Sequence, residues 1–118
     1  MSKFFELSES VYGDGDTKWS SGNYIQVSVQ FDKGKGYCLV ADAVGYGDGM
    51  ISKAFCKEYY ELYYDLSMLI VPCSRRSKKQ EAVAEAYLAA HGGEFAQKWI
   101  DCAIERGGKE VAIIKEVK

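Results

Sequence analysis

Residues 65–90 read DLSMLIVPCSRRSKKQEAVAEAYLAA. The stretch begins with the most apolar run of the chain, over residues 66–71, which Pro72 ends. It closes with a segment whose apolar side chains recur at helical spacing, and a basic turn lies between the two. The stretch therefore predicts a strand over residues 66–72, a turn, and a helix over residues 80–90.

The predicted helix begins in a cluster of positive charge. The N-terminus of a helix carries partial positive charge, so Lys and Arg are unfavourable there unless an anion offsets them. Ser74 or Ser77 is the expected N-cap, and Gln80 completes a capping box with Ser77. The sequence therefore predicts an anion-binding site, whose expected ligand-binding residues are Ser74, Arg75, Arg76, Ser77, Lys78 and Lys79.

A second interpretation of the same cluster stays open. Long basic side chains can extend into water without meeting the helix dipole. Glu81 and Glu85 lie one turn further on, where they can pair with Lys78 and Lys79. The cluster is then only a solvated surface.

The N-terminal half carries the strand signals. Residues 23–31 alternate apolar and polar side chains, which is typical of a half-buried strand. The glycine-rich loop 32–36 predicts a hairpin, with a second strand over residues 37–44. Residues 3–11 fit a first strand or a short helix, and the strand is preferred. Residues 111–114 are expected to form a last strand. Two Tyr-Gly-Asp-Gly copies, at residues 12–15 and 46–49, predict loops at sheet ends.

Residues 52–65 fit two patterns. Helical spacing favours a helix over residues 53–64, whereas alternation favours a longer strand that continues to residue 70. The helix is the preferred interpretation. Paired tyrosines at helical spacing cover two faces, which fits the core and rim of an amphipathic helix. A docking surface is the other interpretation, because exposed tyrosines are enriched at interfaces. The expected interface residues are Tyr59, Tyr60, Tyr63 and Tyr64.

Two helices are expected in the C-terminal half. His91-Gly92-Gly93 is expected to end the first, and a second should run over residues 94–106. The sequence therefore predicts a single α+β domain over residues 1–118, in which an antiparallel sheet is packed on one face by a C-terminal helical hairpin.

Metal and catalytic motifs are weak. The four cysteines form no C-x-x-C pair and are expected to be reduced thiols. Asp14-x-Asp16 begins like a calcium loop, but Lys18 and Ile25 occupy positions that need oxygen ligands. A Cys73–His91 nucleophile pair would lie at opposite ends of one helix. Val40-Ala41-Asp42 followed by Gly47-Asp48-Gly49 resembles the metal-binding turns of metal-dependent serine/threonine phosphatases, but a third matching acid is absent. We expect no metal, no cofactor and no catalytic residues, and the pattern favours a binding protein over an enzyme.

Charge and composition set the compartment and the partners. The formal net charge is −2, so no global positive field exists to attract nucleic acid. No signal peptide or membrane span is apparent, and a cytoplasmic location is expected.

The expected function is binding of an anionic, phosphorylated ligand, either a small molecule or a nucleic acid. The alternative is a protein–protein interaction, inhibitor or accessory module that docks through its tyrosine-rich surface. A homodimer is expected from the tyrosines and from a terminal strand with an open edge.

Overall fold

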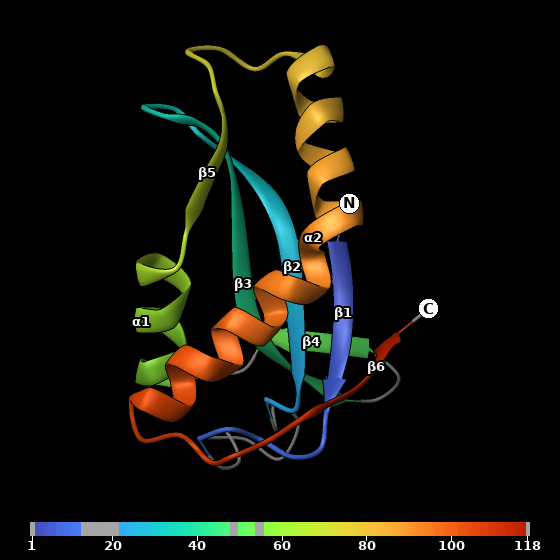
Figure 1. Ribbon diagram of the computed structural model, residues 1–118, viewed down its shortest axis with the longest axis vertical. Helices are drawn as coiled ribbons and strands as arrows, with labels where there is room; N and C mark the ends of the chain where they lie inside the picture. The colour runs from blue at the N-terminus through green and yellow to red at the C-terminus, as the bar shows by residue number, and fades with distance from the viewer. Residues whose placement is uncertain (1, 13–21, 48–49, 54–55, 118) are drawn as a thin grey trace.

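The computed structural model describes residues 2–12, 22–47, 50–53 and 56–117, and Figure 1 shows how its helices and strands are arranged. The elements follow in the order β1 (Ser2–Leu7), β2 (Tyr24–Asp32), β3 (Gly36–Gly47), β4 (Met50–Lys53), α1 (Lys57–Asp65), β5 (Met68–Pro72), α2 (Lys78–Glu105) and β6 (Ile113–Val117). The fold is α+β, as the sequence predicts.

The sheet is antiparallel and is built around the β2–β3 hairpin. Strand order is β4-β3-β2-β1-β6, and β5 also pairs with β3. Because β2 pairs along β3 from residue 36 to residue 44, β4 and β5 share the other edge of β3 at its two ends. The predicted strands at residues 23–31 and 37–44 are confirmed, and β3 runs three residues further than expected. Among the described strands, β6 pairs only with β1 and ends the sheet.

Alternation in β2 decides which face of the sheet is buried. Ile25 and Val27 are fully buried, whereas Gln26 and Ser28 are only partly covered. Strand β3 behaves differently, because Cys38 and Val40 are buried as well as Leu39 on its other face. Both faces of β3 are therefore covered, which is why its sequence alternates less clearly than that of β2.

The ambiguous segment before the basic turn resolves into a helix and a short strand. Helix α1 places Tyr59 and Leu62 in the core, at helical spacing. Strand β5 then pairs with residues 36–39 of β3. The preferred interpretation of residues 53–64 as a helix is confirmed for residues 57–64, whereas Lys53 belongs to β4 and residues 54–55 lie outside the described residues.

The predicted helical hairpin is wrong, because α2 is one continuous helix through Gly92 and Gly93. Gly92 is buried against β1, where a Cβ atom would lie 3.0 Å from Cδ of Lys3 and 3.2 Å from Cδ1 of Leu88. Figure 1 shows α2 bending about halfway along its length, and paired glycines are a common cause of such bends. The glycines therefore allow close approach and curvature instead of ending the helix.

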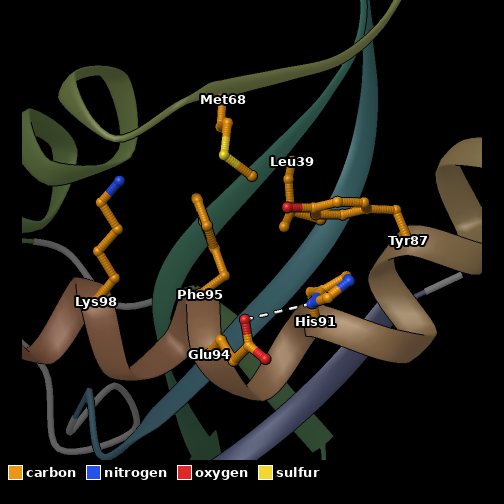
Figure 2. A pocket seen from close by; sticks show the side chains of 7 residues that line it. All are labelled: Leu39, Met68, Tyr87, His91, Glu94, Phe95 and Lys98. Atoms are coloured by element: carbon orange, nitrogen blue, oxygen red, sulfur yellow. Dashed lines mark hydrogen bonds and ion pairs between the residues drawn. The ribbon is translucent and has the colours of Figure 1, made fainter.

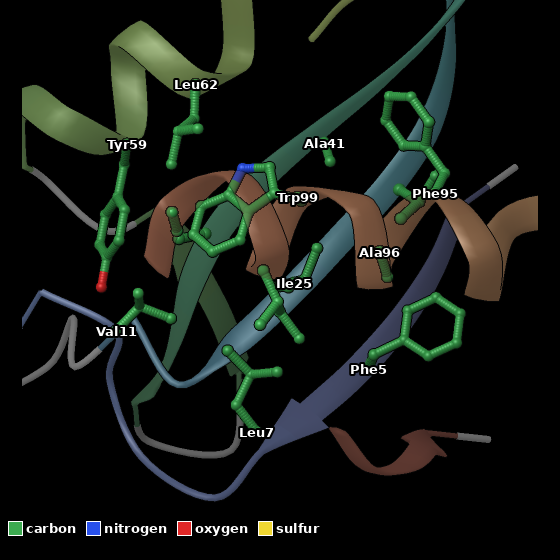
Figure 3. Packing of buried hydrophobic residues seen from close by; sticks show 14 of the residues in the cluster. Phe5, Leu7, Val11, Ile25, Ala41, Tyr59, Leu62, Phe95, Ala96 and Trp99 are labelled. Atoms are coloured by element: carbon green, nitrogen blue, oxygen red, sulfur yellow. The ribbon is translucent and has the colours of Figure 1, made fainter. Parts of the chain in front are cut away.

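The main hydrophobic cluster lies between α2 and the sheet, and Figure 3 shows its packing. Trp99 of α2 is fully buried at its centre, with Tyr59 of α1 tilted against it at a ring-centroid distance of 5.7 Å. Strands β1 and β2 and both helices contribute side chains, among them Phe5, Leu7, Ile25, Leu62, Phe95 and Ala96. None of the helices described is long and apolar enough to cross a membrane.

Parts of several expectations lie outside the described residues. Residues 13–15 of the first predicted loop and residues 48–49 of the second fall there. So do Asp14, Asp16 and Lys18 of the calcium-like stretch, and Asp48 and Gly49 of the phosphatase-like turn.

The two glycines of α2 should respond differently to substitution. At Gly93 a Cβ would make an ordinary contact, 3.8 Å from Cε1 of Phe5, so Gly93→Ala should raise the free energy of unfolding by about 0.5–1 kcal/mol through helix propensity. Gly92→Val should lower it by about 1–3 kcal/mol through overpacking against Lys3 and Leu88. Urea unfolding measures both. Equal losses at the two positions would mean that the bend itself requires both glycines.

Candidate functional site

Ser77 starts α2 as its N-cap. Its backbone is extended, with φ −147°, and its Oγ accepts a hydrogen bond of 3.4 Å from the backbone N–H of Gln80. The expected cap is therefore confirmed, and the first helical residues are Lys78 and Lys79. All four cationic side chains of the basic turn are exposed, as is Ser74.

Tyr37 of β3 holds the Ser77 cap in place through two hydrogen bonds. Its hydroxyl donates a hydrogen bond of 3.2 Å to the backbone carbonyl of Ser77 and accepts one of 3.0 Å from the Ser77 N–H. The Tyr37 ring is 2% exposed and packs with Val71 and Ala84 in a second, smaller core cluster. The start of α2 therefore rests on a strand of the sheet.

The turn between β2 and β3 lies beside the basic turn. It is closed by a 3.0 Å hydrogen bond from the Lys35 N–H to the Asp32 carbonyl, and the Asp32 carboxylate accepts another from Gly34 N–H. The Lys35 carbonyl accepts a 3.3 Å bond from the Cys73 N–H. At Gly36, with φ +133°, a Cβ would lie 2.2 Å from the Val71 carbonyl oxygen, so only glycine lets the two segments meet.

This contact brings two further lysines to the basic turn. Figure 1 shows the β2–β3 turn and the segment before α2 at the same end of the molecule. We call this surface the basic end, and it consists of Lys33, Lys35, Arg75, Arg76, Lys78 and Lys79, all of which are exposed. The two hairpin lysines were absent from the sequence-based site. The only signal for them was the glycine-rich hairpin itself, whose position relative to residue 75 no local pattern reveals.

The basic end is an open surface. The Arg76 guanidinium lies over the Phe31 ring, 5.0 Å from its centroid, which is a cation–π contact that orients the side chain. All six cationic side chains of the basic end are exposed, and none of them lines the groove between β5 and α2. Such a surface can contact phosphates along one side without enclosing them.

The tyrosines of α1 divide between core and surface. Tyr59 is 2% exposed, and its hydroxyl accepts a 3.4 Å hydrogen bond from the Tyr12 N–H, so it lies in the core and not on a surface. Tyr60 and Tyr64 are 37% and 70% exposed. Tyr63 is partly buried, with its ring edge-on to Tyr64 at 5.1 Å, and burial together with Asp42 raises its pKa. The interface expectation stays a prediction for Tyr60, Tyr63 and Tyr64.

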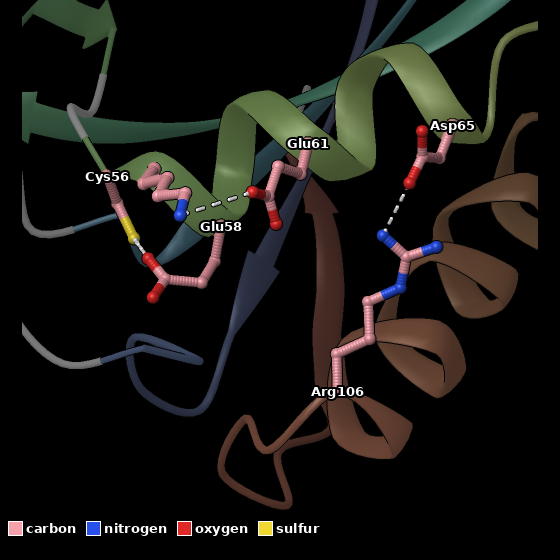
Figure 4. Close-up of polar contacts among 6 residues, drawn as sticks. Cys56, Glu58, Glu61, Asp65 and Arg106 are labelled. Atoms are coloured by element: carbon pink, nitrogen blue, oxygen red, sulfur yellow. Dashed lines mark hydrogen bonds and ion pairs between the residues drawn. The ribbon is translucent and has the colours of Figure 1, made fainter.

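The polar contacts of α1 are shown in Figure 4. The Cys56 thiol donates to the Glu58 carboxylate at 2.8 Å, and Arg106 contacts Asp65 at 2.7 Å, tying the end of α1 to the end of α2. Burial, and then the bond to Glu58, raises the pKa of the Cys56 thiol. The thiol is therefore held in its protonated form, which is a poor nucleophile.

The structure separates Cys73 from His91. Cys73 precedes α2, whereas His91 lies near the middle of that helix, about 20 Å further along its axis. His91 contacts Glu94 at 3.3 Å, and its ring is tilted against that of Tyr87 at a centroid distance of 4.5 Å. All four cysteines are free thiols. Among the described residues, no three His, Cys, Asp or Glu side chains gather where they would hold a metal ion.

A groove runs between β5 and α2, over Leu39 of β3. One part of it has a volume of about 140 Å³, and Figure 2 shows Met68 on one side and Tyr87, His91 and Phe95 on the other. A second hollow of about 450 Å³ continues the groove toward the start of α2, and it is lined by Met68, Leu69, Ile70, Val83, Ala86, Tyr87, Ala90 and His91. Most of the residues that line the groove are apolar, and Glu94 and Lys98 line its smaller hollow.

Comparison of the chain with protein-family models, with curated proteins and with solved structures gave no match.

The Tyr37–Ser77 contact can be tested by removing one oxygen atom. Tyr37→Phe loses two hydrogen bonds, so we expect the free energy of unfolding to fall by about 1–2 kcal/mol in urea. Tyr64→Phe, at an exposed position, is the matched control and should change it by less than about 0.5 kcal/mol. Equal effects of the two substitutions would contradict the role that we assign to Tyr37.

Proposed function

We propose that this chain is a non-enzymatic binding protein whose basic end holds an anionic, phosphate-bearing ligand. The observation that carries the proposal is the meeting of six exposed cationic side chains, from the β2–β3 turn and from the start of α2, at one end of the molecule. The N-terminus of α2 lies at the same end, and the helix dipole adds partial positive charge there.

The charge balance of this end favours an anion. In the segments that form it, residues 32–36 and 73–81, the acids are Asp32 and Glu81. Asp32 already accepts a hydrogen bond from its own turn. Arg75 and Arg76 offer forked donors that suit phosphate oxygens, and the lysines act as point charges. The positive potential is therefore local, although the whole chain carries a net charge of −2.

The open shape supports one class of ligand over another. Small molecules are usually enclosed in a pocket. A nucleic-acid backbone presents phosphates along one side and is held by exposed Lys and Arg, with release of counterions. A phosphate chain of this kind fits the basic end better than a single small phosphorylated molecule.

One observation favours the second function. Tyr60 and Tyr64 are large, exposed side chains on one short helix, and a surface of this kind suits docking to another protein. Under this alternative, the chain is an interaction or accessory module and α1 is its contact element.

Charge reversal separates the two functions. The double variant Arg75→Glu with Arg76→Glu should weaken binding of a labelled single-stranded oligonucleotide by about a hundredfold or more in fluorescence anisotropy, because two contacts are lost and repulsion replaces them. The control pair Lys98→Glu with Lys109→Glu makes the same change of charge away from the basic end and should have little effect. Equal losses of affinity in the two double variants would mean that only the net charge of the protein matters, and would contradict a site at the basic end.

The hairpin lysines can be tested by the salt dependence of the same binding reaction. Lys33→Ala with Lys35→Ala should reduce the slope of log K against log salt by about 1.4, which is the value for two single-strand phosphate contacts. An unchanged slope would remove the β2–β3 turn from the site. If the unsubstituted protein binds neither the oligonucleotide nor inorganic polyphosphate, the anion function fails and pull-down with Tyr60→Ala and Tyr64→Ala becomes the relevant experiment.

A further inference from the structure

One face of α2 is regular, exposed and covered by no other described element. Lys79, Val83, Ala86, Ala90 and Glu94 follow one another at spacings of four, three, four and four residues, which places them on one stripe of the helix. Val83 is 51% exposed, the two alanines are exposed, and the Glu94 side chain is 78% exposed. Spacings of three and four are those of a helix–helix seam, and alanines allow two helices to approach closely.

The stripe is complementary to itself. It begins with a positive side chain, ends with a negative one and is apolar in between. When a second copy is turned about a two-fold axis beside Ala86, Lys79 of one subunit falls opposite Glu94 of the partner subunit. In the same register Val83 faces Ala90 of the partner subunit. Both ends of the antiparallel pair then carry an ion pair, as a closed two-fold interface requires.

We infer that this stripe is the contact surface of a homodimer in which the two α2 helices pack antiparallel. The larger hollow of the groove beside it, lined by Leu69 and Ile70 of β5, supplies apolar surface for the partner subunit's helix. This inference does not depend on the anion site. Lys79 belongs to both surfaces, and the other five cationic side chains of the basic end remain outside the seam.

Features of β5 favour a helix over an added strand as the occupant of the groove. The register between β3 and β5 shifts between Tyr37 and Cys38, which leaves Ile70 as an extra residue in β5. Pro72 ends the strand without a backbone N–H. A bulge and a proline are both devices that prevent a further strand from pairing at an edge.

Charge exchange tests the register directly. Lys79→Glu and Glu94→Lys should each weaken the dimer by about tenfold or more in analytical ultracentrifugation, because two ion pairs become two repulsions. The double variant should recover most of that loss, since it restores both pairs with the signs exchanged. Lys78→Glu is the matched control, because its side chain lies next to Lys79 but off the stripe, and it should leave the dimer unchanged.

A disulfide trap tests the position of the axis. In a background with Cys38, Cys56, Cys73 and Cys102 replaced by serine or alanine, and shown to be folded by circular dichroism, Ala86→Cys should form a covalent dimer on oxidation. Ala89→Cys, which is also exposed on the same helix but lies on another face, should not.

Each alternative result overturns the inference. The first such result is an unsubstituted protein that stays monomeric at every concentration measured. A dimer whose affinity falls by the same factor in Lys78→Glu and Lys79→Glu, or that cross-links equally at residues 86 and 89, would exclude this register. A dimer that dissociates in Tyr60→Ala with Tyr64→Ala, and not in the α2 variants, would place the interface on α1. The oligonucleotide measurements on the basic end are separate, so failure of one proposal is visible without failure of the other.

Discussion

Burial of one face of α2 against the sheet is the interaction on which the rest of the structure depends. Leu88, Phe95 and Trp99 form a single buried stripe along the helix, and they pack on apolar side chains of β1, β2 and β3. A helix of this length is needed to cover the sheet, and each buried large side chain contributes roughly 1.5–3 kcal/mol. The free energy gained by burying these side chains exceeds the cost of about 1 kcal/mol for each glycine inside the helix. Tertiary packing therefore carries α2 through two glycines that would end an isolated helix.

That competition explains where sequence-based prediction succeeds and where it does not. The strand β2 and the cap at Ser77 depend on local patterns, namely alternation and a serine three residues before Gln80, and both could be predicted. Whether Gly92 and Gly93 end the helix depends on their contact with β1, whose residues lie almost ninety positions earlier in the chain. No local pattern contains that contact. The same reason accounts for Tyr59, whose place in the core is decided by its contact with Trp99.

The site divides in the same way. A run of adjacent basic residues is visible in the sequence, so residues 74–79 could be proposed as a ligand surface. Lys33 and Lys35 join them only because Gly36 lets β3 touch β5, and because the Lys35 carbonyl bonds to the Cys73 N–H. Tyr37 is hidden from pattern analysis for a further reason. Its ring follows the apolar pattern of a buried strand, whereas its hydroxyl group hydrogen-bonds to the backbone of the N-cap residue of α2.

Net charge is a poor guide to what such a surface attracts. At an ionic strength of about 0.1 M, charges are screened over roughly 10 Å, so a ligand at one end of a molecule 39 Å long responds mainly to the charges of that end. The acids of α1 and the cations of the basic end belong to different parts of this length, as Figure 1 shows. An antiparallel pair of α2 helices would keep the two basic ends apart, with the starts of the helices about 25 Å from each other. Two separated positive surfaces on one dimer suit a long phosphate chain, because its second contact then forms at a high effective concentration.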